Sequence, residues 1–294
     1  MCTIGAADFP ADFDVNIYRE RNDDLRRFAD SELINHYKKF GADEGRVGNC
    51  VFGRGSFLSV IDKIRPALEL GPFCDPLMIG ADVEYFDVLT TEQLRERAAA
   101  LGLSVESCPS IKYASPYGDL SVVDQKFDLV FSSHNIEHQP NLVKHFNDVD
   151  AILTPQGRYA LIVPDKRYCF DHFIGPSTLA DVLAAYVENR VMHSTTSVLE
   201  HRLLLTHNDP VRHWAQDHDG PLTKPLKTRF EDTRQELEVM KGKYIDVHAW
   251  QFVPDSFSYI ISALNEMELS PFVVERLYPT TFGAIEFYAI LRKC

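Results

Sequence analysis

The most informative pattern in the chain is an apolar run followed directly by a polar cluster, in residues 127–138. The first five residues, Phe-Asp-Leu-Val-Phe, are rich in β-formers and short enough for a strand buried on both faces of a parallel sheet. The remaining residues include two serines, two histidines and a glutamate. Because ligands in open α/β sheets bind just outside the carboxyl ends of the strands, this cluster predicts a binding or catalytic site.

On both sides of this run, segments with the pattern of a strand alternate with segments with the pattern of a helix. Apolar runs predict strands at 66–70, 83–87, 111–114, 127–131, 159–163, 272–277 and 285–291. Helical spacing predicts helices at 57–64, 94–101, 142–153 and 255–268, with a turn at Pro155-Gln156-Gly157. Five strand–helix units that end in an antiparallel strand pair are a strong signature of an α/β fold.

The predicted fifth strand is followed by residues 165–250, which break this rhythm. The segment contains seven of the eleven histidines and no clear strand. Since it leaves the sheet at a carboxyl end, we expect it to form a lid and substrate pocket. Lys166, Arg167 and Arg212 are candidates for holding an anionic substrate, although such side chains are more often solvated.

Residues 15–46 form a separate pattern near the amino terminus. Apolar side chains recur there at helical spacing and a glycine provides the stop: Leu25, Phe28, Leu33, Ile34, Tyr37, Phe40 and Gly41. Residues 48–55 are rich in glycine and predict a linker. We therefore expect a tail and helical segment in residues 1–50 and one main domain in residues 51–294.

Composition narrows the classes of partner and compartment. The net charge of −13 argues against nucleic acid as the main partner, which would need a basic face. The six cysteines form no Cys-x-x-Cys pair, a pattern that suits a reducing cytoplasm better than a disulfide scaffold or a cysteine zinc site. Residues 1–14 contain no apolar signal core, and no run reaches the ~18 apolar residues of a membrane span. The sequence thus predicts a soluble cytoplasmic protein with no membrane partner.

Several of these segments together resemble class I S-adenosylmethionine-dependent methyltransferases, over about residues 57–164 and 251–292. The matching positions are Glu69-Leu70-Gly71, Asp87, Asp119-Leu120, Phe127-Asp-Leu-Val130, Glu137-His138 and Leu153-Thr-Pro-Gln-Gly157. The resemblance implies a Rossmann-like seven-stranded sheet, with a large insertion after strand five, that binds S-adenosylmethionine.

The resemblance also assigns cofactor contacts to individual residues. It places Glu69 and Gly71 beside the methionine part of the cofactor and Asp87 on the ribose hydroxyls. A carboxylate can accept both hydroxyl protons in charge-assisted hydrogen bonds. The remaining implied contacts are Asp119 and Leu120 beside the adenine, and Ser132 and Ser133 at the start of the loop that faces the substrate.

The loop after the first strand departs from the family pattern. The family shows Gly-x-Gly-x-Gly, whereas this chain has Gly71-Pro72-Phe73-Cys74. Glycine permits positive φ and close backbone approach, which Pro72 and Phe73 do not easily allow. Either the cofactor is held by a loop of different shape, or cofactor binding has been lost.

The polar cluster itself spells His134-x-x-Glu137-His138. It is similar to the Glu-x-x-Glu-His segment that binds magnesium in ubiquinone-pathway O-methyltransferases and in small-RNA 2′-O-methyltransferases. On a helical turn these three residues share one face, so they are candidate ligands for a divalent metal. Histidine in place of the first glutamate favours zinc, iron or manganese over magnesium. The alternatives are that His134 or His138 acts as a general base, or that the pair only packs near the site.

Residues 15–46 carry a second, shorter resemblance, to helical modules of bacterial surface-polysaccharide assembly proteins. It rests on Tyr18, Asn22, Asp24-Leu25, His36-Tyr37 and Glu44-Gly45-Arg46, with Asp23 replacing the usual proline. The other interpretation of this segment is a helical pair that docks on the main domain.

These observations lead to three hypotheses of function. The first is an S-adenosylmethionine-dependent methyltransferase that acts on a hydroxyl of a small molecule or sugar. The second is a catalytically retired methyltransferase-like module that binds a partner in glycan assembly. The third is a metal-dependent enzyme of other chemistry on the same scaffold. The sequence leaves homo-oligomerisation open.

Overall fold

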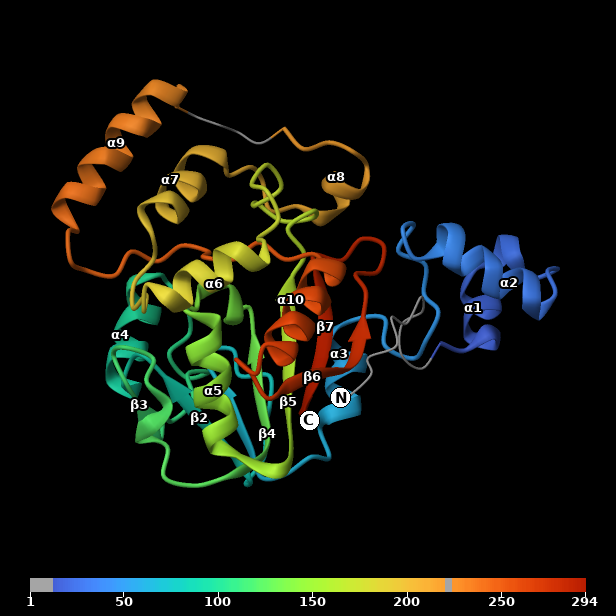
Figure 1. The fold of residues 1–294 in the computed structure, drawn as a ribbon, viewed down its shortest axis with the longest axis horizontal. Coiled ribbons are helices and arrows are strands. Elements are labelled where there is room, and N and C mark those ends of the chain that lie inside the picture. The colour runs from blue at the N-terminus through green and yellow to red at the C-terminus, as the bar shows by residue number, and fades with distance from the viewer. Residues whose placement is uncertain (1–12, 220–223) are drawn as a thin grey trace.

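The described residues, 13–219 and 224–294 of a computed structural model, contain one seven-stranded sheet (Figure 1). The strands lie in the order β3-β2-β1-β4-β5-β7-β6. Their bounds are β1 Ala67–Leu70, β2 Val83–Asp87, β3 Tyr113–Ala114, β4 Phe127–Ser133, β5 Leu153–Pro164, β6 Phe272–Tyr278 and β7 Glu286–Lys293. Strands β1 to β5 are parallel, β7 is antiparallel to β5, and β6 is antiparallel to β7. This arrangement confirms the predicted Rossmann-like α/β fold and its closing antiparallel pair.

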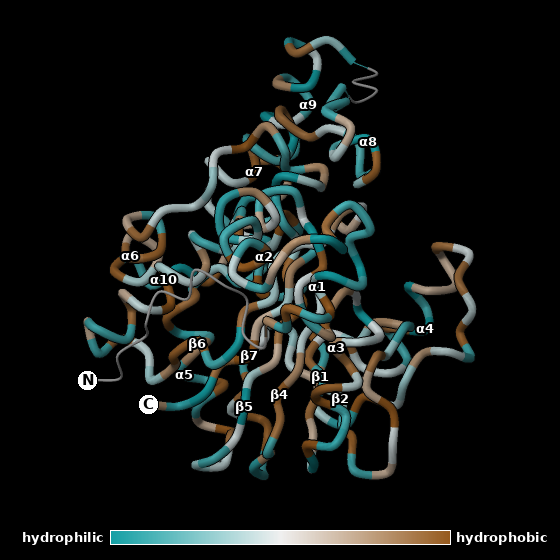
Figure 2. The backbone as a smooth tube through the Cα atoms, turned by 90° about the vertical axis from the view of Figure 1, so that its right-hand side faces the viewer, coloured by the Kyte–Doolittle hydropathy of each residue, from teal (hydrophilic) through white to brown (hydrophobic). Residues whose placement is uncertain are grey.

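Helices cover both faces of the sheet because the central strands are apolar on both sides. On one face, α5 (Leu142–Ile152), α6 (Leu179–Val187) and α10 (Pro254–Glu266) pack into a core that includes Val130 and Leu161. On the other face, Phe57 and Ile61 of α3 (Arg54–Ile61) pack with neighbouring positions of the same strands, such as Phe131 and Ile162. Strand β4 is largely hydrophobic, shown brown in Figure 2. Its successive side chains point alternately into the two cores because side chains alternate between the faces of a strand. Helix α4 (Thr91–Ala100) closes the β2–β3 connection.

One predicted turn and helix end are wrong. Strand β5 begins at Leu153 and continues through Pro155-Gln156-Gly157, where a turn was expected. The pairing of β4 with β5 shifts there, from Phe127 opposite Leu153 to Leu129 opposite Arg158. From Leu153 to Arg158 β5 advances five residues while β4 advances two, so three extra residues form an irregularity in the ladder that takes up the proline and glycine.

The insertion lies beyond the upper edge of the sheet in Figure 1, where β5 ends. It contains α6 together with α7 (Thr195–Leu204), α8 (Pro210–Trp214) and α9 (Leu226–Val239). Within the described residues it forms no strand, only an isolated bridge between Asp165 and Phe252. This bears out the expected absence of regular strands in the described part of 165–250.

The amino-terminal helices, α1 (Val15–Arg21) and α2 (Asp30–His36), have a small core of their own. Short 3-10 and π-helical turns follow them at Asp23–Leu25 and Tyr37–Gly41. The predicted apolar stripe is half wrong: Leu25, Leu33 and Tyr37 are buried, whereas Phe28, Ile34 and Phe40 are exposed. The π-helical turn at Tyr37–Gly41 shifts the angular spacing, so Phe40 leaves the face that Leu33 and Tyr37 bury.

The residues of the amino-terminal motif have structural roles in this small core. A Cβ on Gly41 would lie 2.1 Å from the hydroxyl oxygen of Tyr18, so only glycine fits there. Arg46 donates to Asp24 at 2.8 Å. Most of the predicted tail, residues 1–12, lies outside the described residues. Among the helices that the structure does describe, none combines the length and apolar character needed to cross a membrane.

Candidate active site

The polar cluster after β4 is placed by a sharp turn of the backbone. His134 has a φ of +48°, which is uncommon for a residue with a side chain, and a 3-10 turn at Ile136–His138 follows. The carbonyl oxygen of Glu137 accepts hydrogen bonds from the amides of Ala249 and Trp250, at 2.7 and 3.2 Å. These two bonds bring the end of the insertion alongside the cluster, and His248 comes with it.

The carboxylate of Glu137 lies at the centre of this group. It is 0% exposed, and neither of its oxygens has a hydrogen-bond partner among the residues that the structure describes. Its Oε1 lies 3.9 Å from Nε2 of His138, 3.9 Å from Nε2 of His248 and 4.0 Å from Nδ1 of His134. These separations are too long for hydrogen bonds. The three imidazole nitrogens therefore lie around the carboxylate without donating hydrogen bonds to it.

The far nitrogen of each of these imidazoles is held by a second carboxylate. Nδ1 of His138 lies 3.0 Å from Asp246, and Nδ1 of His248 lies 2.5 Å from Asp171. Nε2 of His134 lies 2.7 Å from Glu286, which also pairs with Arg54 at 2.6 Å. A carboxylate that accepts from one ring nitrogen leaves the lone pair on the other, which is the usual arrangement around a metal-binding histidine.

Electrostatics supports these outer pairs. The imidazole of His138, 3.0 Å away, lowers the pKa of Asp246 to about 2. Burial opposes ionisation of Glu286, but the hydrogen bonds from His134 and Arg54 outweigh it and lower the pKa of that carboxyl to about 2. For His138, burial favours the neutral ring, yet Asp246 and Glu137 more than offset this and raise its pKa. The carboxylates of Asp246 and Glu286 therefore remain ionised at neutral pH.

The arrangement fits a divalent cation on the chemistry of its donors. A buried carboxylate without hydrogen bonds is costly unless it is paired or coordinates a metal. Glu137, His138 and His248 offer ligand atoms that all lie within 4.8 Å of one another, and His134 borders them. The structure thus brings together the three residues named from the sequence and adds His248. Nothing in the local spacing could have indicated His248, because it reaches the cluster only through the path of the insertion.

The loop after β1 adopts the conformation that the sequence argued against. Gly71 has a φ of +67°, and Phe73 also takes a positive φ, of +46°. The ring of Phe73 packs against a small apolar cluster that contains Leu94 and Ala98 of α4. Phe73 therefore takes a backbone conformation usually reserved for glycine, while its side chain is accommodated on the α4 side.

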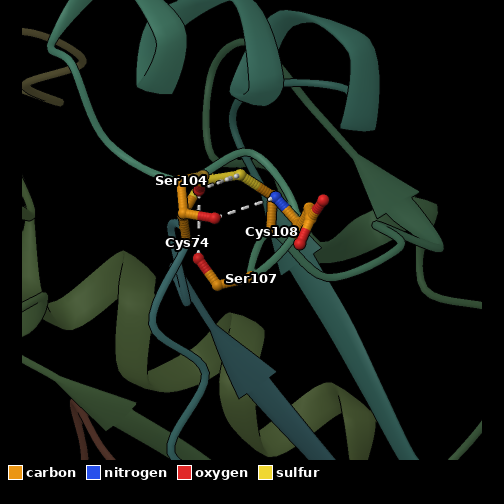
Figure 3. Close-up of a disulfide and its surroundings, with 5 residues drawn as sticks. Cys74, Ser104, Ser107 and Cys108 are labelled. Carbon is orange, nitrogen blue, oxygen red and sulfur yellow. Dashed lines mark hydrogen bonds between the residues drawn. A yellow bond between two sulfur atoms is a disulfide. The ribbon is translucent and has the colours of Figure 1, made fainter.

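A disulfide between Cys74 and Cys108 joins this loop to the segment before β3 (Figure 3). The expectation of scattered, unpaired cysteines is wrong at these two positions. The loop and the segment after α4 converge on the same apolar cluster, which brings residues 34 apart in sequence into contact. The loop after β1 is thus fixed covalently as well as by packing.

Two of the acidic residues predicted beside the cofactor lie at the ends of β1 and β2. Asp87 is 7% exposed and accepts a hydrogen bond from the amide of Leu89 at 2.9 Å; burial raises the pKa of its carboxyl. Glu69 is 2% exposed and accepts from the amides of Leu77 and Met78, and burial raises its pKa to about 7. Glu69 therefore holds the loop after β1 in place, and its contact with a cofactor stays a prediction.

The remaining predicted cofactor contacts are placed differently from one another. Asp119 is exposed and accepts from the amide of Ser121, which lowers the pKa of its carboxyl, while Leu120 is buried. The hydroxyl of Ser132 is buried and lies 3.0 Å from that of Tyr159, which in turn lies 2.9 Å from Nε2 of His145. Ser132 is thus held inside the core under α5, whereas Ser133 is half-buried.

The three cations proposed for an anionic substrate are already engaged. Arg167 forms an ion pair with buried Asp165 at 2.6 Å, and Arg212 pairs with Asp217 at 2.7 Å. Lys166 donates to the carbonyl of His172 at 2.7 Å. These side chains therefore stabilise the insertion.

Comparison with known proteins gives only distant likenesses. No protein-family model matches the chain, and no curated protein is detectably similar to it in sequence. The mitomycin 7-O-methyltransferase MmcR superposes with a TM-score of 0.38 and 12% identity, over 95% of this chain and 60% of that one. The CcbJ methyltransferase from Streptomyces caelestis gives 0.41 and 12%, over 81% and 92% of the two chains. A DhpI–SAM–HEP complex gives 0.40 and 12%, over 95% of both. At these scores the likeness carries no argument, so the fold rests on the strand order and directions.

Proposed function

We propose that the protein is an S-adenosylmethionine-dependent methyltransferase that methylates a hydroxyl group of a small molecule or sugar with the help of a divalent metal. The observation that carries the metal half is the buried, unpartnered carboxylate of Glu137 among three imidazoles. The cofactor half rests on the strand order of the sheet, with Asp87 at the end of β2 as the resemblance implies.

The residues of this chain would divide the work as follows. Asp87 would accept hydrogen bonds from the ribose hydroxyls, and the loop from Gly71 to Phe73 would hold the methionine part of the cofactor. Methyl transfer then needs the acceptor to be aligned with the sulfonium methyl. Glu137, His138 and His248 would hold the metal, with His134 at the rim. When bound there, a divalent cation lowers the pKa of a coordinated hydroxyl and so makes it a nucleophile at neutral pH.

The two roles suggested for the histidines compete with each other. Nδ1 of His138 faces Asp246, so its remaining nitrogen points towards Glu137 and is committed if a metal binds. His134 is the more exposed of the two, with a third of its side-chain surface accessible. We therefore assign His138 to ligation and keep His134 as the candidate for accepting the hydroxyl proton.

A mixed set of imidazoles and one carboxylate favours manganese, iron, cobalt or zinc over magnesium, which prefers oxygen ligands. The test is isothermal titration of the whole protein with S-adenosylmethionine or S-adenosylhomocysteine, before and after treatment with a chelator, followed by elemental analysis. Binding of the cofactor, together with metal whose stoichiometry falls by one equivalent in Glu137→Gln, supports the proposal. Absence of heat at millimolar cofactor argues against it.

The same cluster favours one alternative, a metal-dependent enzyme of other chemistry on this scaffold. It predicts that metal binds tightly while S-adenosylmethionine does not bind, so the titration separates the two. The glycan-related substrate suggested by residues 15–46 gains no support from the comparisons, and the roles of its motif in the amino-terminal core explain the pattern equally well. A cytoplasmic location remains part of the proposal, to be tested together with the redox state of Cys74 and Cys108 in cells.

A further inference from the structure

A second group of imidazoles lies in the insertion, outside the site described above. His172 follows the end of β5, His213 lies in α8, and His218 lies just beyond α8. One ring nitrogen from each lies within 4.8 Å of the other two. His213 is fully buried, and the other two are half-buried. Residues from two separate stretches of the insertion therefore meet at one point.

Backbone carbonyls fix the tautomers of two of these rings. Nε2 of His213 lies 3.1 Å from the carbonyl oxygen of His207, and Nδ1 of His172 lies 2.7 Å from that of Arg167. A carbonyl can only accept, so each of these nitrogens carries the proton and the opposite nitrogen carries a lone pair. Histidines that bind metals use this arrangement, in which the outer N–H donates to a carbonyl or carboxylate.

The lone pairs set in this way are directed into the group. Nδ1 of His213 accepts a hydrogen bond from Nδ1 of His218 at 3.0 Å, so His218 would give up that proton to bind a metal through the same nitrogen. Nε2 of His172 has no hydrogen bond to any residue in the described ranges 13–219 and 224–294.

The backbone around His218 is anchored on both sides. Thr206 donates a hydrogen bond to the carbonyl oxygen of His218 at 2.5 Å. Arg212 pairs with Asp217 at 2.7 Å and donates to the carbonyl oxygen of Asp219 at 2.8 Å. These bonds hold the backbone of His218 beside the cluster.

We propose that His172, His213 and His218 form a second metal site that binds a zinc-class divalent cation, with water in the fourth position. The donors are all imidazole nitrogens, which suit zinc and its neighbours, whereas calcium and magnesium require oxygen ligands. Zinc–nitrogen bonds of ~2.0–2.1 Å place the nitrogens of a tetrahedral site ~3.4 Å apart. The two Nδ1 atoms of His213 and His218 are 3.0 Å apart, and all three donor nitrogens lie within 4.8 Å of one another. The rings of His172 and His218 are stacked 3.7 Å apart, so a bound metal requires these rings to turn towards a common centre.

The site has a clear structural consequence. It joins the segment after β5 to the stretch around α8, which are otherwise connected there by hydrogen bonds and stacking, including that of Tyr168 on Trp214 at 3.9 Å. His172 also directly follows Asp171, the carboxylate that holds His248. A metal bound in the insertion would thus fix the position of a group beside Glu137.

The test uses the full chain after chelator treatment, in a Glu137→Gln background that removes the other candidate site. Titration with Co²⁺ is followed by its visible absorption, whose intensity reports tetrahedral coordination, and Zn²⁺ is then added in competition. His218→Gln and His172→Gln are the site variants, because both residues are half-buried and glutamine keeps a hydrogen-bonding group. His207→Gln is the matched control: its ring stacks on His213 at 4.0 Å, but both its nitrogens already have partners.

We expect one equivalent of tetrahedral Co²⁺, displaced by Zn²⁺, with affinity reduced about tenfold or more in each site variant and unchanged in His207→Gln. Circular dichroism confirms that each variant is folded. The proposal is overturned if the Glu137→Gln protein binds no Co²⁺, or if the site variants and the control weaken binding equally. Binding of metal only by chains that retain Glu137 would leave the proposed function standing and remove this site.

Discussion

The substitution Glu137→Gln should have opposite effects on stability in the absence and presence of metal. Glu137 is completely buried, and neither carboxylate oxygen has a partner among the described residues. Burial of such a group costs about 1–3 kcal/mol when it is neutral and more when it is charged. Glutamine has nearly the same shape without the charge. In chelator, the variant should therefore be more stable than the wild type by about 2 kcal/mol.

Metal should reverse this order. A cation that binds only the folded protein stabilises it by about 2.7 kcal/mol at a hundredfold excess over its Kd. Since 1 kcal/mol shifts the melting temperature of a domain of this size by about 2–4 °C, the wild type should gain about 5–10 °C on addition of metal. Glu137→Gln should gain much less. Differential scanning fluorimetry with Mn²⁺, Co²⁺ and Zn²⁺, in the His218→Gln background to isolate this site, measures both changes.

Glu69→Gln is the matched control for a buried carboxylate. Glu69 is as buried as Glu137, but its oxygens accept hydrogen bonds from the amides of Leu77 and Met78. Its substitution should lower stability by about 1–3 kcal/mol and leave the metal-induced shift intact. The reasoning about Glu137 is refuted if Glu137→Gln is destabilised in chelator as Glu69→Gln is, or if no metal raises the melting temperature of the wild type.

Three further outcomes are expected. Asp87→Asn should weaken S-adenosylmethionine binding by about tenfold or more, because it removes a charge-assisted acceptor, whereas exposed Asp82→Asn should not; titration calorimetry compares them. His145 has a pKa lowered to about 3 by burial, so the unfolded chain binds a proton that the folded one does not between about pH 6.5 and 3. As the pH is lowered through that window, the free energy of unfolding should therefore fall by up to about 1.4 kcal/mol per pH unit. In His145→Gln this dependence of stability on pH should be shallower, as pH-dependent denaturation would show. Cys108→Ser should lower stability by about 3–4 kcal/mol under oxidising conditions, because it removes the disulfide with Cys74 that closes a 34-residue loop. Under reducing conditions the variant and the wild type should be equally stable. An unchanged melting temperature under oxidising conditions would contradict this prediction.

The fold was predictable because its signals are local. Each strand of the sheet is a short apolar run, and the carboxylates of Glu69 and Asp87 mark where two of them end. The sequence prediction failed where contacts with a distant segment of the chain decide the local conformation. Strand β5 passes through Pro155 and Gly157 because its pairing with β4 is interrupted there, and no single-segment pattern contains that information.

The loop after β1 shows a different limit of prediction. Preferences for φ disfavoured Phe73 in a positive-φ turn, at a cost of about 1–2 kcal/mol. Burial of its ring against Leu94 and Ala98, and the disulfide of the next residue, Cys74, supply compensation that depends on α4. Propensity was overruled here by tertiary contacts, and the same contacts explain why the cysteines pair.

The candidate site was half visible in the sequence for a related reason. His134, Glu137 and His138 are adjacent in the chain, so their spacing alone predicts that they meet. His248 and the outer carboxylates Asp171 and Asp246 come from the insertion, whose path is set by the backbone bonds from Glu137 to Ala249 and Trp250. The sequence motif therefore revealed the residues that follow β4 but none of those that the insertion contributes.

This division has a consequence for how the insertion acts. Asp171 and His172 are consecutive residues, yet one holds a ligand of the Glu137 cluster and the other belongs to the three-imidazole cluster. Asp165, at the start of the same segment, is buried and accepts from Thr280 in the β6–β7 connection at 2.7 Å. The segment after β5 is thus fixed to the sheet at one end and to the insertion at the other. If the insertion acts as a lid and the Glu137 cluster binds a metal, as proposed above, the lid supplies both a metal ligand and the carboxylate that orients it. Opening it would then dismantle the metal site, so metal affinity and lid closure should be coupled.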